Sequence, residues 1–87
     1  MRREEIEDHL HGEVKRTRSQ YELALAEFTL VITDIPSGLP QPDGTQGIHN
    51  TARNLRASRE AFQMALNRFN DFILRGKIPD DLKPPPA

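Results

Sequence analysis

The sequence predicts an all-α protein: an antiparallel two-helix hairpin that dimerises into a four-helix bundle. Three observations support this fold class. Proline and glycine gather in two short stretches, apolar residues recur every seven positions in the two long segments between them, and only one short run resembles a β-strand. Helices show the first two features, because proline and glycine are poor helix formers and a surface helix buries one side.

The distribution of proline and glycine indicates the element boundaries. Residues 2–34 contain one glycine and no proline, and residues 48–75 contain neither. We predict a single helical-hairpin domain over residues 1–78, with helices over about 3–34 and about 47–75 and a Pro/Gly linker over about 35–46. Residues 79–87 are expected to form a flexible Pro-rich tail, since Gly76 and Pro79 are typical of a helix end.

Apolar residues lie in rows spaced by seven along both predicted helices. The rows of the first helix are Leu10, Thr17, Ala24 and Val31, and Val14, Tyr21, Phe28 and Ile35. Those of the second helix are Ile48, Leu55, Phe62 and Phe69, and Ala52, Arg59, Leu66 and Ile73. On a helical wheel, Val14, Leu25, Phe28 and Ile32 fall within about 40° of Tyr21. We expect this face to meet the second helix, with Tyr21 near Phe62.

One run of the first helix has an alternative interpretation. Phe28–Thr33, with the sequence FTLVIT, is rich in β-branched and aromatic residues and resembles a strand. No second run could pair with it, and an unpaired strand leaves its backbone polar groups unsatisfied. We therefore favour a helix.

The chain is short, and the helices are too apolar to cover each other. It has 87 residues, no cysteine and 36% hydrophobic residues, so disulfides cannot stabilise it. The stretch Ala24–Ile35 would be apolar on every side of a helix, and Leu23 and Leu30 lie almost opposite Tyr21. A helix that is apolar all round is normally buried all round. We therefore expect a homodimer.

A further row of the second helix, mostly of small residues, would let another helix approach closely. That row is Thr51, Ser58, Ala65 and Phe72. The expected bundle core is Tyr21, Ala24, Leu25, Phe28, Val31, Ile32, Leu55, Phe62, Ala65, Leu66, Phe69 and Ile73. The expected contacts with a further subunit or partner are Leu23, Ala24, Leu30, Val31, Ser58, Ala65 and Phe72.

Two other functions compete with a self-associating interaction module. The chain could be an adaptor whose apolar patch receives the helix of a partner protein. It could also bind nucleic acid through Arg53 and Arg56 of the basic second helix, but a net charge of −1 and arginines spread around the helix make this function the weaker one. A monomer with an apolar patch is the remaining alternative for the oligomeric state.

The sequence shows no pattern that indicates catalysis, so we expect no enzyme, no cofactor and no metal. Asp8 and His11, with Glu5/His9 and Glu7/His11 four residues apart, could hold a divalent ion. They are also typical of an exposed, charged helix start, the interpretation we favour. Residues 35–47 and the Pro-rich tail are left open as binding segments. No apolar run spans a membrane and the N-terminus lacks a secretory signal, so we expect a cytoplasmic protein.

Arg59 interrupts an apolar row and has two interpretations. Its aliphatic stem could pack while its charge reaches solvent or Glu22. Alternatively, it could form a buried or interfacial ion pair that determines how the helices align. The first interpretation is slightly favoured.

Overall fold

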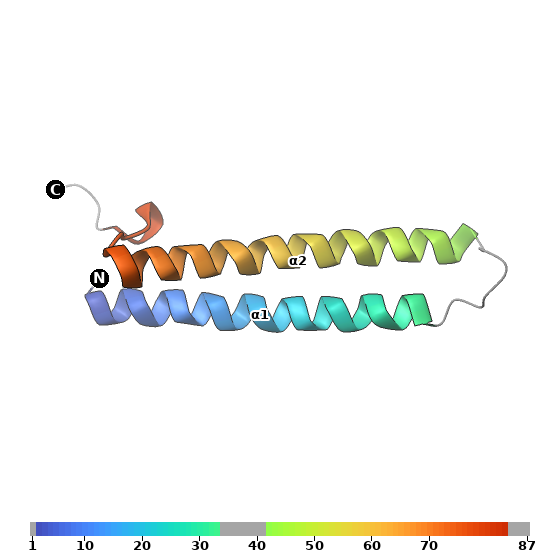
Figure 1. Ribbon diagram of the computed structural model, residues 1–87, viewed down its shortest axis with the longest axis horizontal. Coiled ribbons are helices and arrows are strands. Elements are labelled where there is room, and N and C mark those ends of the chain that lie inside the picture. The colour runs from blue at the N-terminus through green and yellow to red at the C-terminus, as the bar shows by residue number, and fades with distance from the viewer. Residues whose placement is uncertain (1, 34–41, 84–87) are drawn as a thin grey trace.

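The protein is a helical hairpin, shown as a computed structural model in Figure 1. Helix α1 (Arg3–Thr33) and helix α2 (Pro42–Arg75) run antiparallel, and a short 3-10 helix, η1 (Asp80–Leu82), follows. The structure describes residues 2–33 and 42–83, with only the helical backbone for 42–46. These residues contain no strand, so Phe28–Thr33 is helical and the predicted all-α hairpin is confirmed.

The helix ends agree with the predicted boundaries except at the start of α2. That helix begins at Pro42, about five residues before the expected start. Proline is well tolerated in the first turn, because its missing N–H would have no partner there and its fixed φ is helical. Positions 35–41 of the predicted linker lie outside the described residues.

Gly76 ends α2 as predicted. It has a positive φ of 69°, which glycine adopts without steric penalty. The amides of Gly76 and Lys77 donate hydrogen bonds back to the carbonyls of Phe72 (2.9 Å) and Asp71 (3.2 Å). These bonds satisfy carbonyls at the end of the helix and turn the chain back toward α1.

The C-terminal segment corrects the expectation of a flexible tail from residue 79. Pro79–Lys83 includes η1, and Ile78 and Leu82 pack against a buried cluster of Ile6, Leu10 and Phe72. These apolar side chains close the open end of the hairpin, where α1 begins and α2 ends in Figure 1. Residues 84–87 lie outside the described part of the chain.

The two helices meet along one row of residues from each, which we call the seam. Its members are Leu10, Thr17, Ala24 and Val31 from α1 and Thr51, Ser58, Ala65 and Phe72 from α2. Six of the eight are buried, with Leu10 fully covered and Ala24 2% exposed, and Val31 and Thr51 are half-buried. The middle of the seam consists only of small side chains, which allow the two backbones to approach closely.

The seam corrects the predicted contact face of α1. The expected face was centred on Tyr21, but the buried row lies about 60° around the helix from it, and Leu25 and Ile32 are 44% and 46% exposed. The physical reason is size: large side chains do not fit between backbones that alanine, serine and threonine bring together. The predicted alignment of the helices is nevertheless confirmed, because the rings of Tyr21 and Phe62 lie 5.9 Å apart.

The hydroxyl groups in the seam do not bridge the helices. Thr17 Oγ1 donates to the carbonyl of Glu13 (2.7 Å), Thr51 Oγ1 to that of Gly47 (2.9 Å) and Ser58 Oγ to that of Leu55 (3.0 Å). Each hydroxyl is thus satisfied within its own helix. The seam buries these polar atoms without leaving them unpaired.

We expect Ala65→Leu to destabilise the protein by about 1–3 kcal/mol, because the added carbons must force the helices apart. Urea unfolding followed by circular dichroism measures the free energy of unfolding. Ala61→Leu is the matched control: Ala61 is exposed on the same helix, so the same atoms extend into solvent. Equal stability of the two variants would contradict a closely packed seam.

Candidate interaction surface

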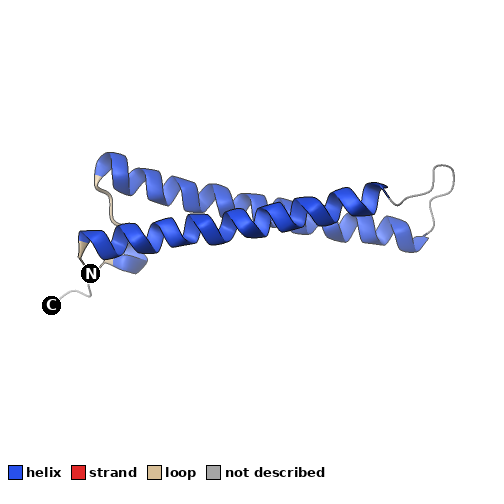
Figure 2. Ribbon diagram, turned by 90° about the horizontal axis from the view of Figure 1, so that it is seen from below, coloured by secondary structure: helices blue, strands red, loops and turns tan. Residues whose placement is uncertain are grey.

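The hairpin is one layer of helices, so both sides of the seam face solvent. Its Cα atoms span 62 × 20 × 17 Å, and Figure 2 shows the two long helices crossing, with η1 beside them at one end only. Away from that end, the side chains beside the seam are covered only by the two helices themselves. The two sides differ sharply in chemistry.

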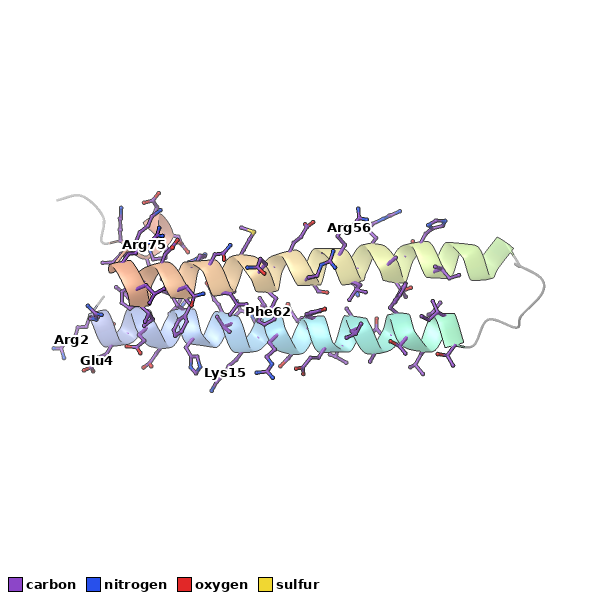
Figure 3. All side chains as sticks on the ribbon, viewed as in Figure 1. Arg2, Glu4, Lys15, Arg56, Phe62 and Arg75 are labelled. Atoms are coloured by element: carbon purple, nitrogen blue, oxygen red, sulfur yellow. The ribbon has the colours of Figure 1, made fainter. Side chains whose placement is uncertain are left out.

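One side, which we call the apolar face, carries the large apolar side chains. The residues four positions after the seam residues form a neighbouring row. On both helices this row lies about 50° from the seam, rotated in the same sense about the helix axis. Because the helices are antiparallel, the same sense places both rows on the same side of the hairpin. The Tyr21–Phe62 contact links them, and Phe62 points from α2 toward α1 in Figure 3.

The apolar face extends along the whole hairpin. From α1 and α2 it comprises Val14, Tyr21, Leu25, Phe28 and Ile32, and Ile48, Leu55, Phe62, Leu66, Phe69 and Ile73. Most of these side chains are half-buried, while Leu25, Ile32 and Ile73 are 44%, 46% and 40% exposed. Since a contiguous exposed apolar patch on a small protein marks an interaction site, this face is the candidate functional surface.

The other side of the seam, which we call the polar side, is flanked mainly by charged, amide and small side chains. Two shallow hollows there are lined in part by Glu13, Gln20, Glu27, Asn54 and Arg68. Leu23 and Met64, each 65% exposed, lie in the same hollows. Charged and amide side chains thus flank the seam on this side, whereas aromatic and branched side chains flank it on the other.

The structure separates the seven predicted contact residues into two groups. Ala24, Ser58, Ala65 and Phe72 are buried between the helices of one chain, at 2%, 9%, 3% and 2% exposure, and Val31 lies half-buried in the same seam. In the closed hairpin these five residues pack between the two helices of one chain, and their contact with a further subunit or partner stays a prediction.

Leu23 and Leu30 remain at the surface, at 65% and 62% exposure. They lie on the polar side of the hairpin, about 100–120° from the seam and away from the apolar face. Their contact with a second chain stays a prediction. Leu25, Ile32 and Ile73 are the exposed residues of the apolar face. Their exposure within one hairpin was not predicted, although the seven-residue spacing of the small residues was a signal for it.

Arg59 lies at the edge of the apolar face and is exposed. It follows Ser58 by one position, so it is about 100° from the seam, in the row of Leu66 and Ile73. Glu22, its suggested partner, forms an ion pair with Arg18 on its own helix (3.1 Å). The hairpin thus leaves the Arg59 charge at the boundary between the apolar face and solvent.

The two histidines at the start of α1 make other contacts. His9 Nε2 lies 3.2 Å from Glu13, and the His11 ring lies 5.7 Å from that of Phe69. Across residues 2–33 and 47–83, no three such side chains gather in a way that could hold a metal ion. Neither described helix has an apolar stretch long enough to cross a bilayer.

A charged cluster joins all three helices on the polar side. The Arg68 guanidinium donates from Nη2 to both carboxylate oxygens of Asp81, at 3.0 and 2.9 Å, and lies 3.7 Å from Glu13. These hydrogen bonds stabilise the charged form of the carboxyl and hold the pKa of Asp81 below its ordinary value of 3.8. Arg68 therefore connects η1 to α1 through α2.

Comparisons with protein-family models, curated proteins and solved structures returned no significant match for this chain. The apolar face and the Arg68 cluster must therefore be interpreted from their own chemistry.

We expect the attachment of η1 to weaken as the pH falls below 3.8. Because the pKa of Asp81 is lowered in the folded state, its contribution is complete above the unfolded pKa and is lost as the carboxylate takes up a proton. The attachment is measured by the rate of amide hydrogen exchange at Leu82 and Lys83, whose amides donate hydrogen bonds to the carbonyls of Pro79 and Asp80.

Two variants test the same attachment at neutral pH. Asp81→Asn should speed exchange at Leu82, while Asp80→Asn should not, because the Asp80 side chain is 97% exposed and pairs only with the nearby Lys83. If Asp81→Asn left this exchange unchanged, the ion pair with Arg68 would not hold η1 in place.

Proposed function

We propose that this chain is a non-enzymatic assembly module that self-associates through its apolar face into a four-helix bundle. The observation that carries the proposal is the position of the large apolar side chains. The middle of the seam between α1 and α2 is filled by small residues, and most aromatic and branched residues line one flank of the seam instead, where a single hairpin leaves them partly in water.

The angular positions of these rows are those of a bundle helix. In a four-helix bundle each helix contacts two neighbours roughly 90° apart, with the core between them. Here the seam residue Ala24 contacts the second helix of the same chain, Tyr21 lies about 60° away at the core position, and Leu25 lies about 100° away. Leu25 and its row are therefore placed to contact a helix of another layer.

A second copy of the chain is the occupant that best satisfies this face. It offers an apolar surface of the same length and width, and cyclic two-fold dimers are the commonest soluble oligomers. Burial of exposed leucine and isoleucine side chains contributes about 1.5–3 kcal/mol each when complete. Doubling the layer would also add the core that a two-helix chain of this size lacks.

Lysine substitutions on the two sides of the seam test the proposal. We expect Leu25→Lys or Ile32→Lys to weaken self-association by about 10- to 100-fold, because the charged side chain loses the apolar contact and resists burial. Sedimentation equilibrium over a dilution series measures the dissociation constant. Leu23→Lys and Leu30→Lys are the matched controls, with the same chemistry on the polar side, and should leave it unchanged.

Different results would indicate different functions. If the Leu23 and Leu30 variants weakened the dimer and the other two did not, the interface would be on the polar side, as the sequence analysis expected for those two leucines. A wild-type chain that stayed monomeric at all concentrations would overturn self-association. The adaptor function would then be the one that accounts for the apolar face.

A further inference from the structure

We propose, on the premise of that self-association, that α1 of each copy stacks on α2 of the other, with both helix connections at the same end of the bundle. In this arrangement Arg59 pairs with Glu22 of the second copy. The inference rests on the distribution of charge over the two helices and on the position of Arg59 at the edge of the apolar face.

A two-fold axis allows two ways to join the apolar faces of two antiparallel hairpins. If the axis runs parallel to the helices, α1 lies against α2 of the second copy and the connections share one end. If the axis lies across the helices within the interface, α1 lies against α1 and α2 against α2, with the connections at opposite ends. All neighbouring helices are antiparallel in both cases, so packing alone does not choose between them.

Charge distinguishes the two arrangements. α1 contains seven acidic and four basic residues, a net charge of −3, whereas α2 contains three acidic and five basic residues, a net charge of +2. Stacking α1 on α2 of the second copy brings opposite charges together along both contacts. The other arrangement places like net charges side by side in both helix pairs, which costs free energy.

The position of Arg18 adds a local argument. It lies midway along α1, one position after the seam residue Thr17, and therefore in the same row as Leu25 and Ile32 that faces the second layer. If α1 packed antiparallel against α1 with full overlap, Arg18 would face Arg18 of the second copy on the two-fold axis. In the proposed arrangement its row faces that of Leu66, over which its aliphatic stem can pack.

Arg59 then gains an ion-pair partner, which it lacks among the described residues of its own chain. Because Tyr21 contacts Phe62, Glu22 and Arg59 lie within about one helical turn of each other along the long axis of the hairpin. Within one chain, Glu22 and Arg59 both point away from the seam, about 150° and 100° from it. Across the proposed interface, the guanidinium would extend over Leu25 of the second copy to Glu22 at the outer edge, where Glu22 already holds Arg18.

Cysteine cross-linking tests the arrangement, and the chain contains no cysteine that could interfere. Arg18→Cys and Leu66→Cys chains, one carrying a mass tag, are mixed, allowed to exchange subunits and oxidised with diamide. We expect a disulfide between the two different chains, and little or no cross-linking of Arg18→Cys with itself. A mixture of Ile32→Cys and Ala52→Cys should likewise form a disulfide between the two different chains. This second pair replaces the first if Leu66→Cys is unstable.

Each other outcome overturns the inference in a distinguishable way. Rapid cross-linking of Arg18→Cys with itself would show the opposite orientation while leaving self-association intact. A wild-type dimer in sedimentation with no cross-link in either mixture would mean that these rows do not face each other. A monomeric wild-type chain would remove the proposed function and this inference together.

Charge reversal tests the ion pair itself. We expect Arg59→Glu and Glu22→Arg each to raise the dimer dissociation constant severalfold, and the double variant to recover most of the loss. Arg53→Glu is the control for net charge, because Arg53 is exposed and lies on the far side of α2, about 150° from the seam in the opposite sense. A double variant no tighter than the worse single variant would refute the pairing.

Discussion

The close approach of α1 and α2 along the seam determines where every larger side chain of the hairpin can lie. Thr17 and Ala24 face Ser58 and Ala65 across it, and these residues are at most 9% exposed although none is large. Close contact between small side chains brings the two backbones into favourable van der Waals contact, but it leaves little room for large apolar side chains between the helices. Phe28, Phe62 and Tyr21 are consequently displaced to one flank.

That displacement gives the two flanks their different chemistry. The residues four positions after the seam are aromatic or aliphatic in both helices except at Gly76, whereas those three positions after it, such as Glu13, Gln20 and Asn54, are polar or charged except at Ala61. An antiparallel pair brings equivalent rows to the same side, so the hairpin acquires one apolar and one polar face. Amphipathicity, usually a property of one helix, here belongs to the pair, and it supports the proposed bundle.

The C-terminal segment stabilises the end of the hairpin where the connection cannot. Leu82 and Ile78 extend the cluster around Phe72 and Leu10, and Arg68 holds η1 by its paired hydrogen bonds to Asp81. The Arg3 guanidinium lies 5.4 Å from the centre of the Phe72 ring, on the same cluster. The largest buried side chains thus gather at this end, while the middle of the seam remains narrow.

The sequence by itself determined the helical class, the antiparallel alignment and most helix ends. Proline is excluded from helix interiors by local geometry, and Gly76 ends α2 because a positive φ suits glycine. Only the tertiary structure decided which side of each helix faces the other. Tyr21 and Ala24 lie about 60° apart on one continuous apolar arc, and periodicity cannot choose between neighbouring rows of such an arc. Which row faces the other helix depends on how closely the two backbones can approach, and this distance is a property of the helix pair. The burial of Ala65 and the exposure of Leu25 therefore follow from the tertiary structure and not from either helix alone.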